Sequence, residues 1–361
     1  MKQRNGTVDF LKFIFAVLIV MFHSKNLATG VEESYFIGGS IGVDFFFLVS
    51  GFFLASSALK KPYLNEKSLG EDTFEFMKHK IAGLMPNYYV AWTIAFAVFH
   101  IVQTSTLKII IKDGVSAFFE LLLISETGII GYKANGVTWY LSAMLIAMLI
   151  IYPLIRKYKE IFFYVIGPLI VLFILGIAFQ EFKDLRTAHA WVFGFIFKGM
   201  LRAISEITFG AIIYKMSQAL RQVEFTIVSK IIFTVIEVLA FSGVILYVFD
   251  HRGSKFDWYL VFALAIGVLL AASSVSYTAK IFRGRVFTWL GEYSLSLYLG
   301  HGFWSKVFND IPIIGTMPYY QKVYVYLAVA IVTGLAIMYI SKLISYIWRV
   351  RKNAIKCVFI K

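Results

Sequence analysis

Ten apolar segments, each about 20 residues long, recur along this chain of 361 residues. A helix of that length spans the hydrocarbon core of a bilayer, where the backbone must satisfy its own hydrogen bonds. The pattern predicts an all-α fold: a polytopic membrane helical bundle of about ten transmembrane helices, forming a single domain over residues 1–361. The predicted spans are 8–28, 38–58, 83–103, 136–155, 161–180, 192–215, 227–249, 258–277, 286–308 and 322–346.

The composition supports a membrane protein. Hydrophobic residues make up 59% of the chain and charged residues 16%, whereas soluble domains contain about 25% charged residues. The formal charge of +14 could indicate a nucleic-acid partner, but no basic, aromatic-interleaved soluble segment carries that charge. We therefore expect membrane lipids and no nucleic acid as partners. The single cysteine, Cys357, lies in the basic C-terminal tail, has no disulfide partner and is expected to be inert.

The basic residues predict the topology. Lysine and arginine are about twice as frequent in one alternating set of loops as in the other, and positive loops stay in the cytoplasm. Both termini and the basic tail 347–361 are therefore predicted to be cytoplasmic. No small-residue cleavage site follows His23, so we expect a retained first helix and not a signal peptide. The external stretch 107–125 is amphipathic and is predicted to lie on the membrane surface.

Lys12 and His23 are ionisable residues inside the apolar first span. On a helix they lie about 16 Å apart along the axis, and their side chains are about 20° apart around it, so they share one face. Ionisable groups at membrane depth usually face a cavity, a partner or a substrate path. The pair suggests a site that is charged at one end and catalytic at the other. Two simpler explanations stay open: Lys12 could snorkel to the interface, and His23 could anchor a helix end.

Other spans carry ionisable residues at similar depths. Asp44, in the second span, could orient the imidazole of His23 or could close a turn at the helix start. In the ninth span, Glu292 and His301 match the depths of Lys12 and His23, which predicts two layers, Lys12–Glu292 and His23–His301, if the helices adjoin. Glu292 could act structurally or catalytically.

The sixth span carries Lys198, Arg202 and Glu206 at four-residue spacing, so they share one helix face. Arg202 and Glu206 could form a structural ion pair or a polar wall for a substrate. Trp139 could belong to an interfacial aromatic belt or stack on a sugar ring. In the second span, Gly51 permits a close approach between helices.

Five segments, in order, resemble the membrane acyltransferase-3 family over nearly the whole chain. They are GTVDFLKFIFAVLIVMFH (6–23), SIGVDFFFLVSGFFL (40–54), KIAGLMPNYY (80–89), VTWYLS (137–142) and WLGEYSLSLYLGH (289–301), with a looser match at GMLRAISEITFG (199–210). Lys12 stands where the family more often has arginine. Lys80 and Gly83 replace two further expected arginines, which weakens the third segment.

The resemblance implies an integral enzyme that O-acylates surface glycans in a bacterial-type plasma (inner) membrane. The donor would be an acyl-CoA, expected to be acetyl-CoA, bound from the cytoplasm near Lys12, Lys78 and Lys80. The two lysines on the third helix could equally be positive-inside residues without a ligand. The acceptor would be a hydroxyl of a cell-surface or lipid-linked glycan, and no metal is expected.

The resemblance also implies roles for the buried polar residues. His23 would be the general base, assisted by Asp44, and Glu292 is a further catalytic candidate. The expected acceptor-binding residues are Arg202, Glu206, Trp139 and His301. A transporter or flippase of a polyprenyl-linked glycan is the alternative, although no paired broken helices indicate it. A scaffold protein would leave Asp44, Glu206 and Glu292 unexplained.

Overall fold

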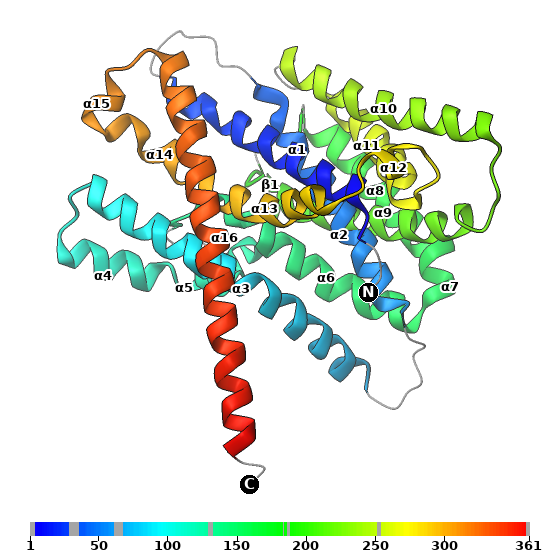
Figure 1. Cartoon of the computed structure of the whole chain (residues 1–361), viewed down its shortest axis with the longest axis horizontal. Coiled ribbons are helices and arrows are strands. Elements are labelled where there is room, and N and C mark those ends of the chain that lie inside the picture. Colours follow the sequence, from blue (N-terminus) through cyan, green and yellow to red (C-terminus); the bar gives the residue numbers. More distant parts are fainter. Residues whose placement is uncertain are drawn as a thin grey trace.

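The computed structural model describes residues 4–28, 36–60, 68–128, 133–182, 184–185, 188–250 and 254–358. Helices dominate this part of the chain and pack as a bundle, from which the C-terminal end of the last helix projects (Figure 1). The side chain of Cys357 and the last residues of the basic tail lie outside the described set.

The N-terminal third begins with two closely packed helices. Helix α1 (Gly6–His23) is followed by the 3-10 turn η1 (Ser24–Leu27), and η2 (Ile37–Ile41) leads into α2 (Gly42–Ala58). Asn5 caps α1 because its side chain accepts a hydrogen bond from the backbone N–H of Val8. Helix α3 (Leu69–Val102) follows, and then the short helices α4 (Leu107–Ser116) and α5 (Phe118–Leu121).

The remaining helices complete the bundle. Their bounds are η3 (Ser125–Thr127), η4 (Gly136–Thr138), α6 (Trp139–Lys157), α7 (Lys159–Ile161), the π-helical η5 (Phe162–Ile166), α8 (Gly167–Glu181), α9 (Lys198–Leu220), α10 (Ile227–Asp250), α11 (Asp257–Ser273), α12 (Thr278–Ile281), α13 (Arg285–His301), α14 (Trp304–Val307), η6 (Phe308–Asp310), α15 (Pro312–Gly315) and α16 (Tyr319–Val358). Two-residue strands β1 (Trp191–Val192) and β2 (Ile196–Phe197) pair antiparallel before α9.

The all-α membrane architecture agrees with the prediction. Among the described residues, 7 helical stretches are long and apolar enough to cross a membrane. They are Gly6–Leu27, Ile37–Ala58, Leu69–Val102, Gly136–Lys157, Lys159–Glu181, Ile227–Phe249 and Tyr319–Arg351. The other three predicted spans fall mainly on α9, α11 and α13, of which α11 is a shorter apolar helix. The total of ten crossings stays a prediction.

Two predicted boundaries are wrong for local reasons. The sixth span was expected to begin at 192, but a hairpin precedes α9, and its turn places Phe193 at φ 51° and Gly194 at φ 76°. The third helix was expected from 83 but begins at Leu69, because Ser68 and Glu71 form a capping box. The polar first turns of α3 therefore extend beyond the apolar segment.

Close helix contacts position the interior polar groups. Helix α2 packs extensively on α9, and α1 packs along α13 (Figure 1). A Cβ atom on Gly51 would lie 1.9 Å from the carbonyl oxygen of Ile207, and one on Gly210 would lie 2.0 Å from that of Leu48. Glycine is therefore required at both positions, and the expected close approach at Gly51 is confirmed.

Candidate functional site

Two histidines meet where α1 and α13 end. The ring centroids of His23 and His301 are 5.0 Å apart, with the planes inclined by 51°. His301 is fully buried, His23 is partly buried, and the ring of Tyr298 lies 5.6 Å from that of His301. The predicted proximity of His23 and His301 is confirmed. The histidine pair, as we call these two residues, places two proton-accepting nitrogen-containing rings side by side in the interior.

A buried ion cluster lies between α2 and α9. The Arg202 guanidinium donates to both carboxylate oxygens of Asp44, over 2.6 and 2.7 Å from Nη2, and its Nε lies 3.7 Å from Glu206. The three side chains, which we call the Arg202 cluster, are essentially excluded from solvent. The Arg202–Glu206 ion pair considered from the spacing is therefore present, and Asp44 completes it.

The placement of Asp44 differs from the expected one. Its two oxygens bind Arg202, so the contacts of the described residues assign this carboxylate to the guanidinium and not to the imidazole of His23. Buried charges require a partner, and a bidentate guanidinium meets that need fully. Asp44 therefore holds the Arg202 side chain by hydrogen bonds to Nε and Nη2.

The predicted pair between Lys12 and Glu292 is not formed. The Lys12 ammonium binds Asp9 over 3.1 Å, one helical turn earlier, and lies over the ring of Phe53. Glu292 is partly exposed and binds Arg4 over 2.9 Å and Lys342 over 3.0 Å. The two predicted partners are nevertheless connected, because Arg4 also binds Asp9.

The expected donor-binding lysines of α3 differ in position. Lys80 is partly buried, whereas Lys78 is exposed. Gly83 is also exposed, and a Cβ there would meet nothing within 4 Å. Of these two lysines, only Lys80 is partly enclosed by the bundle, and Lys78 lies on the helix surface.

Trp139, at the start of α6, lies among other aromatic rings. Trp139 packs against Phe47, with centroids 6.1 Å apart, and against His189, at 6.2 Å. The His189 ring also lies 3.2 Å from the buried carboxylate of Glu126. Trp139 is thus held between helices and beside a polar pair, so the position combines an aromatic face with hydrogen-bonding groups.

The segment that leads into α6 is tied to a buried carboxylate. Glu120 accepts hydrogen bonds from the backbone of Ala134 and Asn135 and from the side chains of Thr138 and Trp92. Burial raises the pKa of Glu120, while these donors act in the opposite direction. Asn135 in turn donates to the carbonyl of Leu299, two residues before His301. This network fixes the surroundings of the histidine pair.

Several of these polar residues were not predicted. Asp9 precedes Lys12 by three residues on the first helix, and this i,i+3 spacing was the available signal. Glu126 and His189 are far apart in sequence, so the folded chain alone brings them together. Within the described residues, no group of three or more His, Cys, Asp or Glu side chains could hold a metal ion.

Apolar helices that enclose ion clusters and a histidine pair define a multi-pass membrane protein with an internal polar site. A family described as "Acyltransferase domain" matches residues 5–345, which is nearly the whole chain. The chain therefore belongs to the acyltransferase-3 family. The resemblance seen in the sequence segments is confirmed.

Curated relatives agree with this family. The chain is 24% identical over 359 residues to proteins named "O-acetyltransferase OatA" from Staphylococcus aureus, strains NCTC 8325 / PS 47 and COL. The alignments cover 91% of this chain and 54% of each relative, so the chain spans about half the length of these proteins. No solved structure matches the chain significantly.

Proposed function

We propose that this protein is a plasma-membrane O-acyltransferase that moves an acetyl group from acetyl-CoA to a hydroxyl of a cell-surface or lipid-linked glycan. The single observation that carries the proposal is the contact between His23 and His301 inside a chain of the acyltransferase-3 family. The printed name of the Staphylococcus aureus relatives supports O-acetyl transfer. The bacterial inner membrane is the expected location.

His23 is the general base in this proposal. It accepts the proton of the acceptor hydroxyl as the hydroxyl oxygen attacks the thioester carbonyl carbon. The C–O bond forms, the C–S bond breaks, and the thiolate leaves as coenzyme A after it takes up the proton from the imidazolium. The ring of His301 lies 5.0 Å from that of His23, between centroids. In this proposal His301 binds the acceptor and holds its hydroxyl oxygen close to His23.

The donor approaches from the predicted cytoplasmic side and the acceptor from the opposite side. Lys12 and Lys80 attract the anionic donor, and Lys78 adds positive charge at the helix surface. Glu292 accepts a hydrogen bond from Arg4 and so holds this arginine at the donor side of the bundle. Trp139 offers a ring face for the sugar, while Arg202 and Glu206 form a polar wall behind the reacting groups.

Transfer of isotope-labelled acetyl in purified proteoliposomes tests the proposal. Labelled acetyl-CoA is supplied on the outside or the inside of the vesicles, with bacterial lipid-linked glycans as acceptors. We expect acetylated glycan and free coenzyme A in equal amounts. Movement of labelled glycan across the bilayer without acetylation would support a flippase and overturn the proposal.

A further inference from the structure

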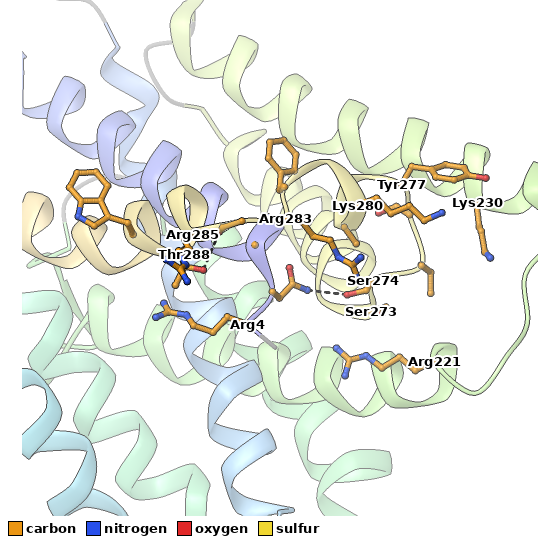
Figure 2. A pocket seen from close by; sticks show the side chains of 18 of the residues that line it. Arg4, Arg221, Lys230, Ser273, Ser274, Tyr277, Lys280, Arg283, Arg285 and Thr288 are labelled. Carbon is orange, nitrogen blue, oxygen red and sulfur yellow. Dashed lines mark hydrogen bonds between the residues drawn. The ribbon is translucent and has the colours of Figure 1, made fainter. Parts of the chain in front are cut away.

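A cavity of about 940 Å³ lies at the end of the bundle where α1 begins (Figure 2). Three regions of the chain surround it: the residues before α1 with its first turn, the end of α9 with the first turns of α10, and the stretch from the end of α11 to the first turns of α13. All three belong to regions that the charge pattern places in the cytoplasm. The volume is typical of a ligand pocket, which measures about 300–1,000 Å³.

The lining of this basic cavity is cationic. Six cationic side chains face one carboxylate, that of Glu292; the cations are Arg4, Arg221, Lys230, Lys280, Arg283 and Arg285. Figure 2 shows that these cations come from different segments around one space. Glu292 binds Arg4. In the part of the chain that the structure describes, Lys280, Arg283 and Arg285 have no carboxylate within ion-pair distance.

This excess of positive charge is more than topology requires. Positive-inside residues need only lie in cytoplasmic loops, whereas here residues up to 281 positions apart in sequence gather around one concave space. The first turns of α1 and α13 also border the cavity at Gly6 and Arg285, and helix N-termini favour anions. Arginine and lysine donors of this kind match phosphate oxygens, to which arginine can bind bidentately.

We propose that the basic cavity is a phosphate-binding site that holds the nucleotide phosphates of the acyl donor. This inference rests on the proposed function, since it assigns the phosphates to acyl-CoA. An anionic lipid headgroup offers the same phosphate chemistry and is the competing source. Ser274 and Thr288, which also line the cavity, offer hydroxyl oxygens to the rest of the nucleotide.

The position of the cavity suits a donor that reaches inward. Arg4 lines the cavity and binds Asp9, and Asp9 binds Lys12. Gly6, which lines the cavity, precedes His23 by 17 residues on the first helix, so the two lie about 26 Å apart along the helix axis. In this proposal the nucleotide end of the donor lies in the cavity, and the long, uncharged arm carries the thioester along α1 towards the histidine pair.

Coenzyme A binding, measured by calorimetry on the full-length protein in neutral phosphatidylcholine nanodiscs, tests the inference. The variant is Lys280→Gln/Arg283→Gln, which changes two exposed cations of the cavity. The control is Lys157→Gln/Lys159→Gln, which removes the same charge from the end of α6 and from α7. Dephospho-coenzyme A and pantetheine serve as probes with fewer or no phosphates.

We expect the cavity variant to weaken coenzyme A binding by about tenfold or more, since it removes charge-assisted hydrogen bonds, and the control to leave binding unchanged. Affinity should fall in the order coenzyme A, dephospho-coenzyme A, pantetheine. The cavity variant should bind pantetheine as the wild type does.

The outcomes separate the two proposals. Equal coenzyme A affinity in the cavity variant and the control would overturn the cavity assignment alone, whereas no coenzyme A binding by the wild type would overturn the proposed donor as well. A second arm measures retention of phosphatidylglycerol by the purified variants. Loss of this lipid from the cavity variant, with coenzyme A affinity intact, would identify a headgroup site and contradict the donor assignment.

Discussion

Arg202 is the cation of a buried ion cluster between two helices of the bundle. It faces two carboxylates, those of Asp44 and Glu206, and all three side chains are buried. In a low-dielectric interior a charge that loses its partner is costly, whereas an exposed ion pair contributes little. The four-residue spacing of Arg202 and Glu206 was visible in the sequence. The arrival of Asp44 from α2 depends on how α2 and α9 pack.

Arg202→Met should destabilise the protein by about 3–5 kcal/mol, because it leaves two buried carboxylates without a cation. The control is Lys159→Met, which removes an exposed pair with Glu160 and should cost about 1 kcal/mol or less. Unfolding in one detergent, followed by circular dichroism, measures both. Similar small losses for the two variants would mean that the Arg202 cluster is hydrated.

Lys12 should couple to Asp9 and not to Glu292. In double-mutant cycles that combine Lys12→Met with Asp9→Asn or with Glu292→Gln, the direct partner should show a coupling of about 0.5–3 kcal/mol. The second cycle should be close to additive, because Lys12 and Glu292 are joined only through Asp9 and Arg4. A larger coupling in the cycle with Glu292 would restore the pairing expected from the sequence.

Pairs of helices determine how closely the site residues approach. Helices α2 and α9 touch at Gly51 and Gly210, which brings Asp44 within reach of Arg202. The apolar periodicity located most helices well, since each predicted span falls on a helix. It missed the capping box that starts α3 and the hairpin before α9, because polar helix turns and short strands carry no apolar signal of sufficient length.

Gly51→Ala should destabilise the α2–α9 contact by about 1–3 kcal/mol, because the added methyl overlaps the Ile207 carbonyl. Gly243→Ala in α10 is the matched control, since a Cβ there meets nothing within 4 Å. The control should be neutral or slightly stabilising. Thermal unfolding of the two variants measures the difference. If Gly51→Ala unfolds at the same temperature as the control, α2 and α9 can move apart without a loss of stability, which would contradict this account.

At the scale of the whole molecule, contacts join chain segments that the charge pattern predicts to lie on the same side of the membrane. Asp72 at the start of α3 binds Arg156 at the end of α6 over 2.7 Å, and both are predicted to be cytoplasmic. Gln103 donates to Asp310 over 2.7 Å, and both are predicted to be external. These contacts join segments that the charge pattern puts on the same side. The pattern could not foresee the basic cavity, because its residues come from three regions that are far apart in the sequence.

The topology predicts the labelling of single cysteines in intact cells, in a Cys357→Ser background. A cysteine at Lys108 in α4 should react with an impermeant thiol reagent, and one at Lys159 in α7 should react only after the cells are permeabilised. Both positions are exposed at the protein surface. These two positions are chosen because the connections 61–67 and 251–253 lie outside the described residues. The reverse pattern would place the donor site on the external side.

The transfer rate of labelled acetyl by His23→Ala tests the account most directly. The variant should insert normally but lose about 10²–10⁴ in rate, because it lacks the general base. The control is His79→Ala, an exposed histidine of α3, which should transfer acetyl as the wild type does. Wild-type turnover by a correctly inserted His23→Ala would contradict the account, because the histidine pair would then be a packing contact and the acceptor proton would have to leave by another route.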